Sequence, residues 1–168
     1  MGSDKVLSIK SNILWSSIGS IIGLSCQWLI SVLVVRLSFG FSDAGLYSLS
    51  MSVYGIFFPI AQYRMYTYQV SDVNGENTVG EYLSFRLLTI LLSLVLTFAY
   101  SLFTCRPVSV FCIFLYGLYK SANQLIDVLH AADQQFSRMD YVGVSLALQG
   151  ALSLVFFCVA LSCFRSVP

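Results

Sequence analysis

Long apolar runs that carry almost no charge constrain this chain more than any other feature. An α-helix needs roughly 20 apolar residues to cross the hydrocarbon core of a bilayer. Runs of about that length occupy residues 13–35, 44–63, 87–104, 108–129 and 141–163. They are continuous rather than alternately apolar and polar, so they predict helices and not the strands of a barrel. We therefore expect an all-α integral membrane protein with five transmembrane helices, in a single membrane domain over residues 1–168.

The composition agrees with a lipid environment. Hydrophobic residues make up 57% of the chain and charged residues 10%, against roughly 25% charged residues in soluble domains. The net charge of +1 provides no basic field for nucleic acid, so we expect no nucleic-acid partner. The first apolar run is too long for a cleavable signal peptide.

Polar segments separate the runs. Ser42 or Asp43 is a candidate cap for the second helix, and Pro107 suits the first position of the fourth. The longest gap, residues 64–86, is predicted to be a loop with a turn at Asn74-Gly75. Residues 130–140 are predicted to be a polar link.

Lysine and arginine near the helix ends predict the orientation. A cytoplasmic N-terminus places five of them on the cytoplasmic side, against three on the other. The five are Lys5, Lys10, Arg64, Arg86 and Arg138, and the three are Arg36, Arg106 and Arg165. This excess favours a cytoplasmic N-terminus.

The fourth run carries a stripe of polar residues. Tyr116, Lys120, Asn123, Gln124 and Asp127 are spaced so that they share one side of a helix. A charge at the centre of a span costs about 2.5 to 3.5 kcal/mol or more, and Lys120 lies near mid-depth. The stripe either lines a hydrated cavity or joins a buried network, or Lys120 extends to the interface. A position near mid-depth argues against the last.

Other residues predict packing. Gly19 and Gly23 form a GxxxG spacing that permits close helix approach. Pro59 is expected to kink the second helix, and His130 is expected to be solvated. The cysteines are interpreted as packing residues, with a Cys105–Cys163 pair as the alternative.

Signatures of enzymes are missing from the sequence. It contains no Gly-rich phosphate loop, GxSxG or HExxH motif. One histidine and no CxxC pair cannot complete a Cys/His metal set. We therefore expect no enzyme activity, no metal and no cofactor.

The segment 68–73, which follows Arg64 and precedes Tyr82 and Arg86, resembles the second cytoplasmic loop of bacterial polysaccharide flippases. These belong to the multidrug/oligosaccharidyl-lipid/polysaccharide exporter superfamily. The resemblance covers nearly the whole chain. Further residues that fit it are Asn12, Trp15, Gly19, Gly45, Leu46, Tyr47, Lys120, Asp127, Gln134, Gln135, Arg138, Met139, Asp140, Gly143 and Ser145. The chain departs from the family at Asn123, where an acid is common, and at Gln149, where a base is common.

The resemblance implies a flippase of the bacterial cytoplasmic (inner) membrane. It would move a polyprenyl-diphosphate-linked oligosaccharide to the outer leaflet for surface polysaccharide or O-antigen (lipopolysaccharide) export. Such proteins resemble two six-helix bundles, so the chain is expected to be an N-terminal fragment with an incomplete first bundle. Lys120 and Arg64 are the expected ligands of the diphosphate, with Asn123, Gln124 and Asp127 on the same wall.

Two alternatives stay open. One is another transporter of the superfamily, either a lipid II flippase or a drug/cation antiporter. An antiporter needs buried acids, and Asp127 is the single candidate. The other is a non-transporting membrane subunit that partners the polysaccharide polymerase or ligase machinery.

Overall fold

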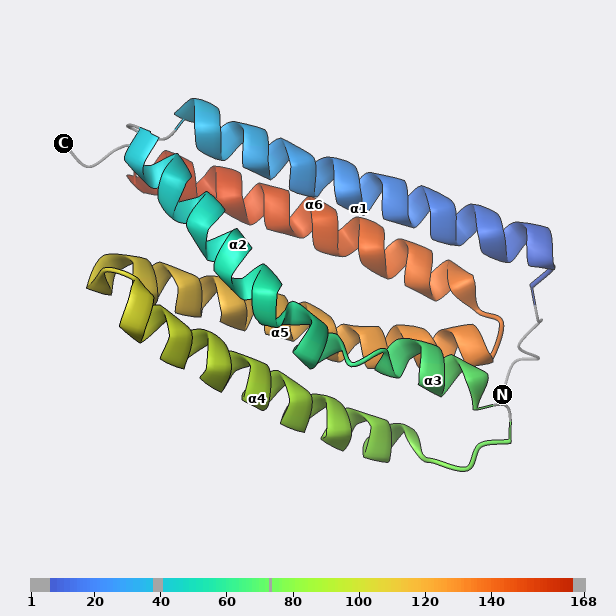
Figure 1. Cartoon of the computed structure of the whole chain (residues 1–168). Coiled ribbons are helices and arrows are strands. Elements are labelled where there is room, and N and C mark those ends of the chain that lie inside the picture. Colours follow the sequence, from blue (N-terminus) through green and yellow to red (C-terminus); the bar gives the residue numbers. More distant parts are fainter. Residues whose placement is uncertain (1–6, 38–40, 73, 165–168) are drawn as a thin grey trace. The chain divides into compact units, whose positions relative to one another are not determined.

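The computed structural model describes residues 7–37, 41–72 and 74–164, and over these residues the protein is all-helical (Figure 1). Each apolar run coincides with a long helix, except that the run over residues 44–63 extends one residue beyond the end of α2, and one short helix is added. The helices are α1 (Ile9–Leu37), α2 (Phe41–Gln62), α3 (Met65–Ser71), α4 (Val79–Thr104), α5 (Pro107–Gln135) and α6 (Met139–Phe164). The prediction that Pro107 begins a helix is confirmed.

Within the described ranges, four helical segments are long and apolar enough to cross a membrane. They are Ile9–Arg36, Ala44–Ser71, Val79–Thr104 and Met139–Ala160. By length and composition the chain is therefore a multi-span membrane protein. α5 has 29 residues but is not among these segments, because Lys120, Asp127 and several amides interrupt its apolar surface. The predicted fourth span at residues 108–129 is confirmed as a helix, and its passage through the membrane stays a prediction.

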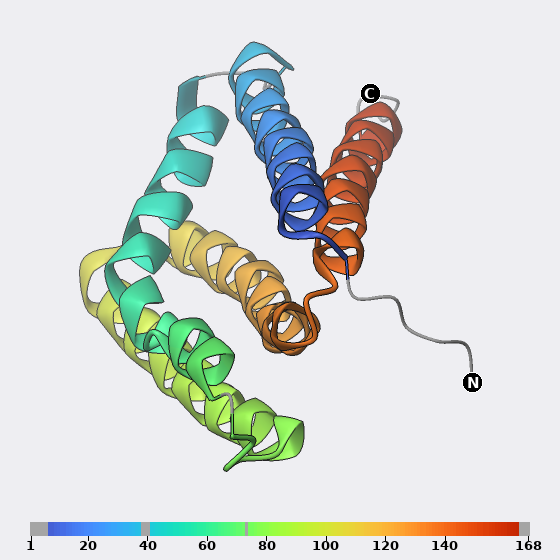
Figure 2. The ribbon, with the colours of Figure 1, turned by 90° about the vertical axis from the view of Figure 1, so that its right-hand side faces the viewer.

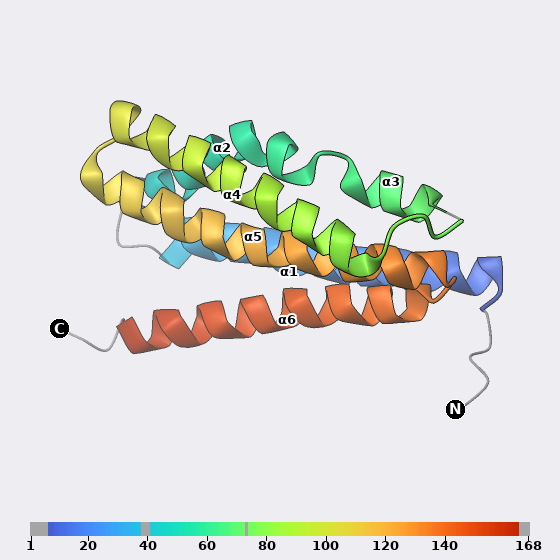
Figure 3. The same cartoon turned by 90° about the horizontal axis from the view of Figure 1, so that it is seen from below.

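The contacts divide the chain into two compact units, residues 1–38 with 136–168 and residues 39–135. The first contains α1 and α6, which run parallel and side by side (Figure 2 and Figure 3). The second contains α2 to α5, in which α4 and α5 form a hairpin and α2 packs against both. We call them the α1–α6 unit and the α2–α5 unit.

Glycines bring α1 and α6 into backbone contact. A Cβ atom on Gly19 would lie 2.3 Å from the carbonyl oxygen of Gly143, and one on Gly143 would lie 2.3 Å from that of Trp15. A Cβ on Gly150 would lie 2.8 Å from the Cα of Gly23. The GxxxG prediction is therefore confirmed, with Gly143 and Gly150 as its partners on α6.

The α2–α5 unit buries polar side chains and exposes leucines. The buried face of α4 repeats every three or four residues, and its members are Tyr82, Arg86, Thr89, Ile90, Ser93, Thr97 and Ser101. Hydroxyl groups donate to backbone carbonyls, as Ser93 does to Phe57 at 3.0 Å. Leu87, Leu88 and Leu91 are half or more exposed. Such packing suits a bilayer, where small and polar residues join helices and apolar residues face lipid.

The predicted loop over residues 64–86 is wrong for most of its length. α3 occupies its first part, and α4 begins at Val79 with a capping box in which Thr78 and Glu81 satisfy each other's backbone N–H groups. Only the connection between Ser71 and Val79 is left, and it contains the expected turn, with Gly75 at φ 67°. α2 and α3 are separated by Tyr63 and Arg64, both left-handed at φ 40° and 49°.

Two further expectations are corrected. α5 continues to Gln135, so the polar link is shorter than residues 130–140. The side chain of His130 is packed inside the unit, with the residue 5% exposed, so the prediction that it is solvated is wrong.

The remaining expectations are not decided. Pro59 lies inside α2, and a kink there stays a prediction. The side chains of Ser42, Asp43 and Cys163 lie outside the described residues, so neither the cap nor the cysteine pair is tested.

Candidate functional site

Lys120 lies on α5 at the edge of the α2–α5 unit. Its position is about 20 Å along the helix from Pro107, at 1.5 Å per residue. The ammonium group lies 5.7 Å from the ring centroids of both Tyr116 and Tyr119, where the ring faces attract a cation. Among the described residues, no carboxylate forms an ion pair with it. Lys120 is thus a cation supported by aromatic rings.

The rest of the predicted stripe divides between core and edge. Gln124 is 2% exposed and its Oε1 accepts from Nη1 of Arg86 at 3.4 Å, so its side chain belongs to the helix core. Asn123 is partly buried. The Asp127 side chain is 40% exposed, and its Oδ1 lies 3.9 Å from Nδ1 of His130. The stripe therefore contains both a buried network, through Gln124, and an accessible edge.

Arg86 is a functional candidate that sequence reasoning placed in a loop. The residue is 1% exposed, and Nη1 donates to the carbonyl oxygens of Ala61 at 3.1 Å and Gln62 at 2.7 Å. These carbonyls lie at the C-terminal end of α2, where a helix leaves acceptors unsatisfied and carries partial negative charge. Thr89 also donates to the Ala61 oxygen, at 3.1 Å. Arg86 thus holds the end of α2 where the chain breaks.

Arg86 and other residues of the α2–α5 unit carry buried polar atoms without a hydrogen-bond partner among the described residues. Within the part of the chain that is described, Nε and Nη2 of Arg86, Nε2 of Gln124 and the hydroxyls of Tyr54 and Ser121 have no hydrogen-bond partner. The sequence contains a signal for this polar face of α4. Tyr82, Arg86, Thr89 and the later hydroxyl residues recur at helical spacing, which could have predicted it.

Glutamine side chains fasten α3 to α5. Gln69 is 1% exposed and donates to the carbonyl of Val128 at 3.0 Å. Gln135 donates to the carbonyls of Gln69 at 2.6 Å and Asp72 at 3.0 Å, which supplies the acceptors at the end of α3 with a partner. Tyr66 donates to Gln134. Residues 68–71 of the segment that carries the family resemblance therefore belong to a helix that packs against α5.

Asp72 organises the connection from α3 to α4. Its carboxylate accepts from the Tyr82 hydroxyl at 2.6 Å and from the backbone N–H groups of Glu76 at 2.9 Å and Asn77 at 3.1 Å. The Tyr82 bond, followed by these backbone bonds, lowers the pKa of Asp72 to about 2. All of these donors favour the ionised form, so Asp72 acts as a structural anchor.

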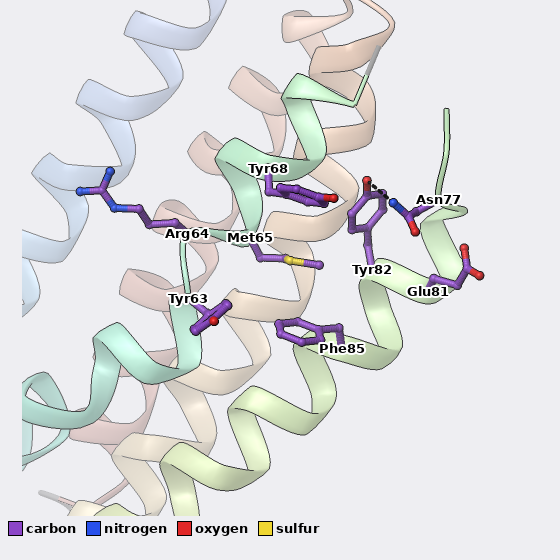
Figure 4. Close-up of a pocket in the computed structure, with 8 residues that line it drawn as sticks. All are labelled: Tyr63, Arg64, Met65, Tyr68, Asn77, Glu81, Tyr82 and Phe85. Atoms are coloured by element: carbon purple, nitrogen blue, oxygen red, sulfur yellow. Dashed lines mark hydrogen bonds between the residues drawn. The ribbon is translucent and has the colours of Figure 1, made fainter. Parts of the chain in front are cut away.

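A pocket of about 550 Å³ lies beside the break between α2 and α3 (Figure 4). Its walls are aromatic, with polar residues at the edge. The lining residues are Tyr63, Arg64, Met65, Tyr68, Asn77, Glu81, Tyr82 and Phe85. Arg64 is exposed, and its guanidinium points away from the rings. Lys120 does not line this pocket, so the two cations predicted to bind one diphosphate belong to different surroundings.

No family model, curated protein or solved structure matches the chain. Its class therefore rests on its helices, which define a multi-span membrane protein.

Proposed function

We propose that the chain forms part of a flippase that moves a polyprenyl-diphosphate-linked oligosaccharide across the bacterial cytoplasmic membrane for surface polysaccharide or O-antigen export. The observation that carries this proposal is Lys120. It is a cation without an ion-pair partner among the described residues, on a polar helix that packs between apolar ones.

The polarity of α5 supports a hydrated surface along this helix. We propose that α5 also spans the membrane and that its accessible edge faces water rather than lipid, since a charge in lipid is costly. A diphosphate needs cations when it leaves bulk water, and a lysine can follow a moving ligand as a point charge. Asn123 and Asp127 follow Lys120 along the helix and offer hydrogen bonds to the sugar.

The family resemblance adds support from the α1–α6 unit. Among its residues, Trp15 and Gly19 contact Gly143, and the Asn12 side chain accepts from the backbone N–H of Met139 at 3.1 Å. Residues from the two ends of the sequence that carry the resemblance thus meet in one interface.

The test is complementation of a flippase-deficient bacterial host by the complete reading frame that contains this chain. Lys120→Ala is expected to abolish surface polysaccharide while membrane abundance stays normal, because the diphosphate loses its cation. Lys120→Arg should restore part of the signal. Lys10→Ala, an exposed lysine at the start of α1, is the matched control and should retain full activity.

Failure of the unaltered reading frame to restore surface polysaccharide at normal membrane abundance would overturn the proposal, and it would favour the alternative of a non-transporting subunit that partners the polysaccharide polymerase or ligase machinery. Full activity of Lys120→Ala at normal abundance would remove Lys120 from the mechanism.

A further inference from the structure

One edge of the Arg86 guanidinium is buried and has donors to spare. Nη1 is used at the end of α2, where it donates to the carbonyls of Ala61 and Gln62. Nε and Nη2 are buried as well, and neither has a hydrogen-bond partner among the described residues. These two N–H groups form the parallel fork with which arginine binds a negatively charged acceptor. The unused edge of Arg86 therefore has the geometry of an anion-binding group.

Donors from two other helices lie near this fork. Gln124 accepts from Nη1 of Arg86 through Oε1 at 3.4 Å, and its Nε2 has no partner in the described part of the chain. The Tyr54 hydroxyl lies beside Ser121 and Gln124, and neither hydroxyl forms a well-aligned hydrogen bond to a described residue. All four side chains are buried, and they come from α2, α4 and α5, which pack against one another (Figure 1). We call these four residues the Arg86 cluster.

The Arg86 cluster carries a positive charge that no close carboxylate balances. Among the described residues, no carboxylate lies within ion-pair distance of Arg86. Asp127 interacts with Arg86 only at longer range, and its Oδ1 lies 3.9 Å from Nδ1 of His130. The carbonyls at the end of α2 supply only partial negative charge. A charge buried without a partner is costly, and more so in a membrane.

We propose that the Arg86 cluster binds a small inorganic anion such as chloride. A chloride ion accepts hydrogen bonds, donates none and neutralises the guanidinium. A water molecule brings two donors of its own and no charge, into a cluster whose unpartnered atoms are mostly donors. The bound anion would connect α2, α4 and α5 beside the break between α2 and α3.

This site is separate from the one proposed at Lys120. The four side chains are enclosed by helices, so they cannot receive a diphosphate that is attached to a sugar and a lipid. The inference therefore does not rest on the proposed function, and its test needs no transport.

The test measures chloride binding by the whole chain, purified in micelles of an uncharged detergent, from the broadening of the chloride NMR signal. The unaltered chain should broaden the signal in a saturable way. Arg86→Met should weaken binding about tenfold or more, because it removes both the fork and the charge. Arg106→Met, at an exposed arginine between α4 and α5, is the matched control and should bind chloride normally.

Further variants leave Arg86 in place, so that the test does not depend on the folding of Arg86→Met. Tyr54→Phe removes one hydroxyl at nearly constant shape and should weaken chloride binding about fivefold, which corresponds to one neutral hydrogen bond. Tyr100→Phe, at an exposed tyrosine of α4, is its control and should have no effect. Asp127→Asn should strengthen chloride binding, because it removes a negative charge that interacts with the same guanidinium.

Stability provides a second readout. At constant ionic strength, replacement of gluconate by chloride should stabilise the unaltered chain and Arg106→Met against unfolding but should leave Arg86→Met unchanged. Equal chloride binding by Arg86→Met and Arg106→Met would overturn the proposal. The absence of both chloride binding and chloride-dependent stability in the unaltered chain would also overturn it, and would assign the cluster to water. Binding that appears only in Asp127→Asn would overturn it too, because Asp127 would then be the counter-ion of Arg86.

Discussion

Gly143→Ala is expected to destabilise the α1–α6 unit strongly, because the added methyl meets backbone rather than a mobile side chain. A Cβ at Gly143 would lie 2.3 Å from the Trp15 carbonyl oxygen, whereas ordinary contacts begin at 3.4 Å. The helices must separate by about 1 Å to accept it, and a gap of 0.5–1 Å forfeits roughly a quarter to a half of each dispersion contact nearby. Overpacking of this kind costs about 1 to 3 kcal/mol, or more where backbone must move.

The assay is equilibrium unfolding in mixed detergent micelles, read by circular dichroism, with Gly55→Ala as the matched control. Gly55 is an exposed residue of α2 with nothing within 4 Å of a Cβ. There alanine should stabilise the helix by about 0.5 to 1 kcal/mol through its propensity. Gly150→Ala should lie between the two, since its Cβ would come within 2.8 Å of Gly23. Equal stability of Gly143→Ala and Gly55→Ala would refute the close packing of α1 and α6.

Three more predictions concern the α2–α5 unit. The pKa of Asp72 falls from 3.8 to about 2 on folding, so its contribution to folding stability is complete above pH 3.8 and disappears as the pH falls through about 2. The protection of the Glu76 and Asn77 amides from hydrogen exchange should follow that pH window and be absent in Asp72→Asn. Gln135→Ala removes two bonds to the end of α3 and should lower amide protection in residues 69–72 about tenfold, equivalent to about 1.4 kcal/mol. Arg86→Met should destabilise the protein by about 1 to 3 kcal/mol because the Gln62 carbonyl loses its 2.7 Å partner, whereas Arg106→Met should have no effect.

Apolar length and simple backbone rules predicted much of the fold. The long runs correspond to long helices because burial in lipid needs only continuous apolar sequence. Pro107 begins α5 because its missing N–H is not needed there. The GxxxG pair on α1 was visible, but its partners Gly143 and Gly150 lie more than a hundred residues away and only the fold identifies them.

The predicted loop over residues 64–86 failed because of contacts between helices. A search for apolar runs leaves out Tyr82 and Arg86 because both are polar. In the structure their polar groups point into the α2–α5 unit rather than to lipid, so the helix includes them. The Thr78–Glu81 capping box was present in the sequence and marks the true start of α4. The break at Tyr63 and Arg64 depends on bonds from Arg86 and Thr89, which no local pattern specifies.

The site residues were predicted as a stripe, and the fold separates them by packing. Gln124 faces Arg86 in the core, whereas Lys120 stays at the edge against its tyrosines. Helical spacing placed these residues on one side of α5, but the position of the neighbouring helices decides which are accessible.

The most direct test of the account is whether water reaches Lys120 along α5 in the membrane. The measurement is labelling of single cysteines by a membrane-impermeant thiol reagent, in cells, after the five native cysteines are replaced by alanine. Lys120→Cys, Asn123→Cys and Asp127→Cys should react, whereas Leu118→Cys, an exposed apolar position on the same helix, should react only after denaturation. Labelling of Leu118→Cys as fast as Lys120→Cys, or no labelling at Lys120→Cys, would contradict a membrane-spanning helix with a hydrated cationic edge.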